Sequence, residues 1–79
     1  MMPRKVYVAV TVKYTEAGEA RPLVIEWEDG RCFEVDRVLD IRRAASTKVG
    51  GCGIRYTCRI RDKQTYLFED EHRWYVEAE

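Results

Sequence analysis

The chain has no hydrophobic run long enough to cross a membrane. None of its apolar stretches approaches the roughly 18 to 20 residues that a spanning helix needs. The first residues lead into strand-like alternation instead of the apolar centre of a secretion signal. These absences argue against a membrane protein, and we expect a cytoplasmic location.

Cysteine and histidine, frequent metal ligands and nucleophiles, are scarce. Cys32, Cys52 and Cys58 are an odd number and cannot complete a disulfide framework within one chain, so we expect reduced thiols. With His72 they have the composition of a Cys3His zinc site, but five residues separate even the closest pair, whereas zinc signatures pair their ligands tightly. We predict no metal and no cofactor; Cys52, among glycines, is a candidate reactive thiol.

Arrangements of residues that indicate catalysis are also missing. His72 follows the acidic residues 69–71 and has no serine or convincing cysteine partner nearby in the sequence. The glycines of loop 46–53 follow its Lys and Ser, and no helix is expected after them, so the loop does not match a phosphate-binding P-loop. At 79 residues the chain is one domain, 1–79, and we predict that it is not an enzyme and find no small-molecule substrate.

Net charge is absent as well, because 14 basic residues balance 14 acidic ones. That balance hides an internal division: positions 37–63 hold eight basic and two acidic residues, a local excess of +6, so the remainder carries −6. A basic region of this kind can attract an anionic partner if folding gathers its charges on one surface.

What the chain does have is strand periodicity. Residues 5–13 alternate valine with mostly polar side chains, and 22–28, 54–61, 64–69 and 73–77 alternate in the same way. Between two of these runs, a three-residue loop at 28–30, with Gly30 in the left-handed conformation, pairs Trp27 with Arg31 and Ile25 with Phe33. Residues 35–45 fit either a bulged strand or a short helix capped by Asp36, and we favour the strand.

These patterns predict an all-β fold, a small antiparallel barrel-like domain of about six strands, SH3-like or similar, because closure hides strand edges. One face of each strand supplies the core. The predicted core residues are Val6, Val8, Val10, Val12, Leu23, Ile25, Phe33, Val35, Leu39, Ile54, Tyr56, Cys58, Ile60, Leu67, Trp74 and Val76.

The segment from Trp27 to Asp40 has the pattern Trp-x-x-Gly-Arg-x-Phe-x-Val-x-x-Val-Leu-Asp. With the later Gly-Ile-Arg-Tyr-Thr and Arg-Trp-Tyr-Val pieces, it resembles a family of small bacterial β-domains of unknown function. The resemblance implies a fold, since the shared residues are those of turns and core, and it implies no activity.

The basic region supplies the candidate site. Its even spacing places Arg55, Arg59 and Arg61 on one strand face, where they can track phosphates, and Tyr7, Tyr66 or Tyr75 can offer stacking surfaces beside them. We predict a non-catalytic binding module whose partner is the nucleic-acid backbone; the alternative is a protein-interaction or structural module. The proposed nucleic-acid contacts are Arg42, Arg43, Lys48, Arg55, Arg59 and Arg61.

Overall fold

The computed structural model describes residues 4–45 and 52–78, and within these ranges it contains seven strands and no helix. No helix of the described chain is therefore long and apolar enough to cross a membrane. The strands are β1 (Arg4–Tyr14), β2 (Ala20–Glu26), β3 (Cys32–Glu34), β4 (Arg37–Ala45), β5 (Cys52–Ile60), β6 (Lys63–Asp70) and β7 (Arg73–Ala78).

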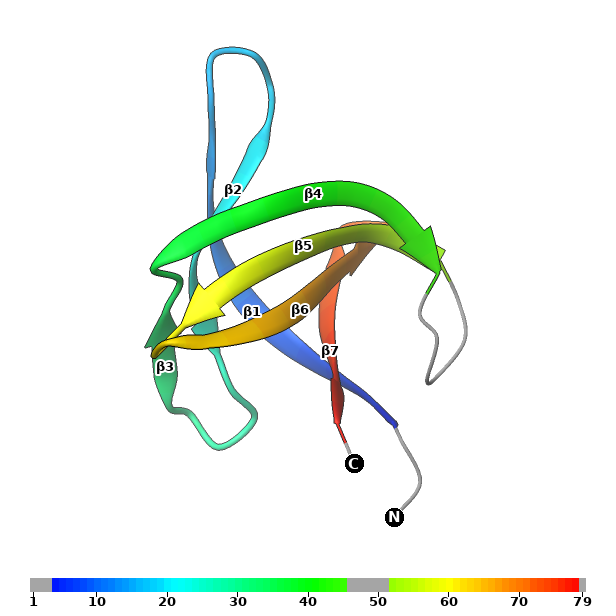
Figure 1. Ribbon diagram of the computed structural model, residues 1–79. Helices are drawn as coiled ribbons and strands as arrows, with labels where there is room; N and C mark the ends of the chain where they lie inside the picture. Colours follow the sequence, from blue (N-terminus) through cyan, green and yellow to red (C-terminus); the bar gives the residue numbers. More distant parts are fainter. Residues whose placement is uncertain (1–3, 46–51, 79) are drawn as a thin grey trace.

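The strands form one antiparallel sheet in the order β3-β2-β1-β7-β6-β5-β4. The sheet curls into a half-barrel, in which β4, β5 and β6 run across the layer formed by β7, β1 and β2 (Figure 1). The all-β, barrel-like prediction is confirmed, with seven strands in place of about six. The segment 35–45, left open between strand and helix, is extended and includes β4.

The two edge strands, β3 and β4, are consecutive in the chain, and this connection closes one corner of the half-barrel. The amide of Val35 donates to the carbonyl of Leu23 on β2 at 2.8 Å. The next amide, that of Asp36, donates to the carbonyl of Arg59 on β5 at 2.9 Å. The chain thus passes directly from one layer to the other, so little backbone is left unpaired at this corner.

The loop between β2 and β3 has the predicted form. Gly30 has a φ of +89°, its amide donates to the carbonyl of Trp27 at 2.9 Å, and the Trp27 amide donates to Arg31 at 2.8 Å. Ile25 lies opposite Phe33, as the apolar pattern requires. This hairpin prediction is confirmed.

The core lies inside the half-barrel and consists mainly of the predicted residues. Phe33 is half-buried but does not pack against this core, and Leu23 and Leu39 are each 43% exposed. Both leucines are the extra residue of a β-bulge: Val12 pairs with Pro22 where Thr11 pairs with Val24, and β4 shifts register around Leu39 in the same way. A bulge reverses the alternation beyond it, so these two core assignments are wrong. The buried cluster is Val6, Ile25, Tyr56, Cys58, Leu67, Trp74 and Val76.

Gly53, at the beginning of β5, has no room for a side chain. A Cβ there would lie 2.4 Å from the backbone oxygen of Glu69 on β6. We expect Gly53→Ala to lower the free energy of unfolding by roughly 2 kcal/mol or more, measured by urea denaturation, because backbone must move. Gly18→Ala is the control: it has open space but a φ of +83°, and should cost only about 1 kcal/mol. Equal losses of stability in the two variants would show that close contact with β6 does not set the requirement for glycine at position 53.

Candidate nucleic-acid interface

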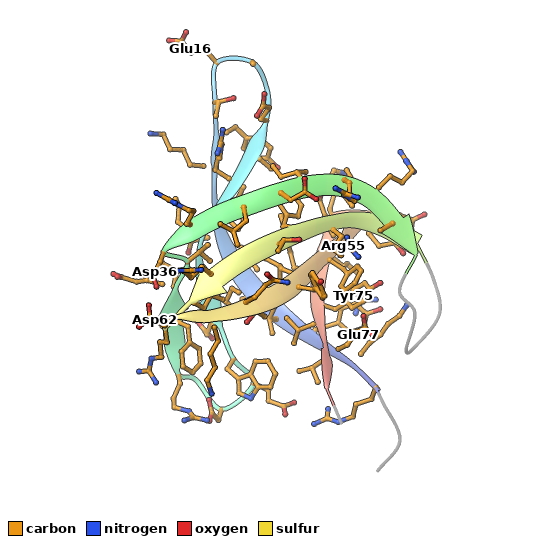
Figure 2. The ribbon with its side chains drawn as sticks, in the orientation of Figure 1. Glu16, Asp36, Arg55, Asp62, Tyr75 and Glu77 are labelled. Carbon is orange, nitrogen blue, oxygen red and sulfur yellow. The ribbon has the colours of Figure 1, made fainter. Side chains whose placement is uncertain are left out.

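The side chains of the central strands that point away from the core form what we call the outer face. Strand register aligns them in rows, because directly opposed residues share a face. The longest row crosses five strands, from Arg42 through Arg55, Phe68 and Tyr75 to Tyr7. Figure 2 labels two members of this row, Arg55 on β5 and Tyr75 on β7. The outer face therefore has a basic end and an aromatic centre.

At the basic end, arginines oppose each other across β4 and β5. Arg42 lies opposite Arg55, and Arg37 lies opposite Arg59. Between these pairs lies Asp40, whose Oδ2 accepts a 2.6 Å hydrogen bond from Nε of Arg42 and raises the pKa of that guanidinium. Four arginines thus surround a single carboxylate on this part of the sheet.

Arg55 is the most constrained of the four. Its guanidinium lies over the ring of Tyr66, 4.6 Å from the centroid, and the side chain is half-buried. Its Nε is buried and has no hydrogen-bond partner within the described residues. Ring stacking thus helps to hold this side chain in place, while its buried Nε lacks an acceptor within the described residues.

The aromatic centre has a buried and an exposed part. Phe68 and Tyr75 are stacked, with ring centroids 5.1 Å apart, and are only 2% and 1% exposed. Tyr7 and Tyr66 flank them and are 44% and 43% exposed. Of the three tyrosines proposed as stacking surfaces, Tyr7 and Tyr66 are accessible and Tyr75 is not.

The structure brings together only part of the predicted basic set. Arg42, Arg55 and Arg59 share the outer face. Arg43 lies opposite Ile54, which packs against the core, and so belongs to the other face of β4. Arg61 lies in the turn after β5, with its guanidinium 5.0 Å from the centroid of the Phe33 ring. Lys48 lies outside the described residues.

Arg37 belongs to the outer face but was missing from the predicted set. Five positions separate it from Arg42, so strict alternation assigns the two to opposite faces. The bulge at Leu39 adds one residue and returns Arg37 to the face of Arg42. The sequence signal for the face of Arg37 was the bulge allowed for in segment 35–45. The sequence pattern did not fix the residue at which this bulge occurs.

The described cysteines lie apart from any cluster of potential metal ligands in the described chain. Cys32 is exposed and Cys58 is buried, both free, and no group of three or more potential ligands gathers within the described chain. His72 is exposed in the turn after β6. The placement of the Cys52 side chain lies outside what the structure describes, so its reactivity stays a prediction.

Comparison of the chain with protein-family models, with curated proteins and with solved structures finds no match. The resemblance to small bacterial β-domains therefore stays a prediction, and the function must be argued from the site itself.

Two tight turns have a costly backbone conformation. Arg61 and Asp62 connect β5 to β6 with φ values of 51° and 63°, and Glu71 and His72 connect β6 to β7 with 49° and 68°. Positive φ at both central residues is typical of a type I′ turn, which favours Asn-Gly. Neither turn contains glycine or asparagine.

We expect Asp62→Gly and His72→Gly each to raise the free energy of unfolding by up to about 1 kcal/mol, because glycine adopts positive φ without steric conflict. Urea denaturation measures this. Lys13→Gly, at an exposed position within β1, is the control and should lower stability. A loss of stability in both turn variants would show that the two turns are not strained by their positive φ values.

Burial also gives a pH-dependent prediction for Cys58. Desolvation raises the pKa of its thiol from 9.0 to about 11. Above pH 9 the unfolded chain loses this proton while the folded chain keeps it, so stability should fall as pH rises towards 11. The contribution is roughly 2 to 3 kcal/mol. Comparing unfolding free energies against pH should show a flatter profile for Cys58→Ala, whereas Cys32→Ala should follow the parent protein; identical profiles for all three would contradict the assignment.

Proposed function

We propose that this protein is a non-catalytic binding module that holds the backbone of a nucleic acid on the outer face of β4 and β5. The observation that carries the proposal is the pair of opposed arginines, Arg42 with Arg55 and Arg37 with Arg59. Like charges directly opposite each other destabilise a sheet, and a polyanion removes that repulsion.

The free charges of this surface support the proposal. Arg37, Arg55 and Arg59 form no ion pair with any described residue, while Arg42 is paired with Asp40. Elsewhere, pairs such as Arg4 with Glu28 at 3.4 Å show that the chain does match its charges. Uncompensated arginines gathered on one face are suited to bind successive phosphates.

The exposed rings favour a single strand. Tyr66 lies opposite Thr57 on the outer face, and its ring is already in contact with Arg55. Tyr7, at the far end of the aromatic row, has the guanidinium of Arg73 3.7 Å from its centroid. Stacking of unpaired bases on such rings is tolerant of sequence, so we expect little base specificity.

We place this module in the cytoplasm, where free thiols such as those of Cys32 and Cys58 stay reduced. The alternative partner is a protein bound by the acidic surface of the hairpin formed by β2 and β3. Glu26, Glu28 and Glu34 are exposed there. Binding through exposed apolar and acidic groups would be much less sensitive to salt than phosphate binding.

The test is an amide NMR titration with short single-stranded and duplex oligonucleotides at low and near-physiological salt. We expect shifts concentrated in β4, β5 and the first half of β6 that weaken as salt rises. An unchanged spectrum at low salt, or shifts confined to β2 and β3, would exclude binding on the outer face and leave the protein partner as the alternative.

Replacement of Arg55 and Arg59 by glutamine should weaken single-strand binding by tenfold or more, since about 0.7 released counterions per neutralised phosphate contact are lost. The salt dependence of the affinity should fall in parallel, measured by fluorescence anisotropy. Arg21→Gln, on exposed β2 and paired with Glu19, is the matched control and should bind as the parent protein does. Equal binding by all variants would show that the outer face is not the site.

A further inference from the structure

The sheet opens between β6 and β7. Their pairing is confined to three residue pairs, from Phe68 opposite Tyr75 to Asp70 opposite Arg73. Beyond Tyr75 the chain of β7 pairs with β1, and β6 continues along β5, so the two strands diverge (Figure 1). A pocket of about 630 Å³ occupies this opening, within the size range of small-molecule sites.

The pocket has an apolar interior with ring surfaces. Ile25 and Val76 of the core line it, together with the rings of Trp27, Phe33 and Tyr66. Gln64 also lines it, and its Nε2 donates to the hydroxyl of Tyr66 at 3.2 Å. Rings around an apolar interior, with a few polar groups, suit a flat ligand whose edge carries hydrogen-bonding atoms.

Three cations line the same pocket: Arg31, Arg61 and Lys63. The ring of Phe33 holds two of them, with the guanidinium carbons of Arg31 and Arg61 at 5.7 and 5.0 Å from its centroid. Arg31 is neutralised by Asp29 at 2.6 Å, whereas Arg61 and Lys63 have no ion-pair partner within the described chain. The lining therefore has two cations without an ion-pair partner in the described chain, Arg61 and Lys63, and one carboxylate, that of Glu77, beside aromatic surfaces.

Arg61 is placed by a strained and anchored turn. Its φ of 51° is unfavourable for a residue with a Cβ, and its amide donates to Oδ2 of Asp36 at 3.2 Å. Figure 2 shows Asp36 and Asp62 close to the start of β6, at the corner where β3 leads into β4. Glycine or asparagine would relieve the strain, but only arginine supplies the guanidinium over Phe33.

We propose that this pocket binds a nucleotide, with the base against the rings of Trp27 and Tyr66 and the phosphate held by Arg61 and Lys63. A nucleotide combines the flat ring, the polar edge and the negative charge that the lining complements. It can be a free mononucleotide or the end of a bound strand, since Tyr66 belongs both to the pocket and to the outer face. Of these two ligands, only the end of a bound nucleic-acid strand rests on the proposed function.

The experiment is an amide NMR titration of the full chain with adenosine monophosphate, with adenosine and inorganic phosphate as partial ligands. We expect the mononucleotide to shift residues 31–33, 61–66 and 76–77 in a saturable manner. Adenosine or phosphate alone should bind about tenfold more weakly or worse, because each lacks half of the contacts. No shift of these residues with the mononucleotide and with a single-stranded oligonucleotide would overturn the inference.

Arg61→Asn tests the phosphate contact, because asparagine tolerates the turn while removing the guanidinium. We expect it to weaken nucleotide binding by about tenfold or more without loss of thermal stability. The matched control is Glu71→Asn, at the equivalent position of the turn after β6, which should bind as the parent protein does. Unchanged affinity in Arg61→Asn would overturn the assignment of the pocket.

The same titrations distinguish binding of a free mononucleotide from binding of the end of a nucleic-acid strand. Shifts in the pocket with the mononucleotide, but none anywhere with oligonucleotides, would support the pocket for a free nucleotide and exclude the proposed function. Oligonucleotide shifts limited to β4, β5 and the first half of β6, with residues 31–33 and 76–77 unshifted in both titrations, would support that function and overturn the inference. Pocket shifts with both ligands would support a site that accepts a strand end.

Discussion

The arrangement of the outer face depends on one backbone irregularity, the bulge at Leu39. A regular strand sends residues alternately to its two faces, so Arg37 and Arg42, five positions apart, would point in opposite directions. The extra residue restores them to one face and places Arg37 opposite Arg59 and Arg42 opposite Arg55. The same bulge leaves Leu39 exposed, so the charge arrangement is obtained at the loss of one core side chain.

The curl of the sheet separates two kinds of apolar surface. Inside it, alternate residues of every long strand contribute to the core around Tyr56, Cys58 and Trp74. Outside it, Phe68 and Tyr75 form a smaller buried cluster, covered in part by cations such as Lys5, whose Nζ lies 4.9 Å from the Tyr75 centroid. Long cationic side chains can cover rings while their charges stay near solvent.

Much of this fold follows from local sequence. The features that do not follow from it share one physical reason. Gly30 and the apolar alternation around it predicted the hairpin between β2 and β3, because turn type and register constrain each other locally. Leu23 and Leu39 were assigned to the core incorrectly, since a bulge depends on how strands twist and close, which one strand's pattern does not contain.

The candidate site was predicted less completely than the fold. The structure places Arg42, Arg55 and Arg59 on one face, whereas Arg43 points to the opposite face and Arg61 contributes to the pocket. The burial of Tyr75 on the outer face was not foreseen, because alternation alone treats that face as solvated. Both errors concern cross-strand neighbours, which only the register of the folded sheet reveals.

We propose that the opposed arginines bind an anionic partner and repel each other without one. The most direct measurement is the unfolding free energy of Arg59→Gln, without ligand, at low and high salt. We expect an increase of about 0.3 kcal/mol at low salt that disappears at high salt, because removing one cation relieves its repulsion with Arg37. A decrease in stability at low salt would contradict this repulsion, since it would show that Arg59 stabilises the fold itself.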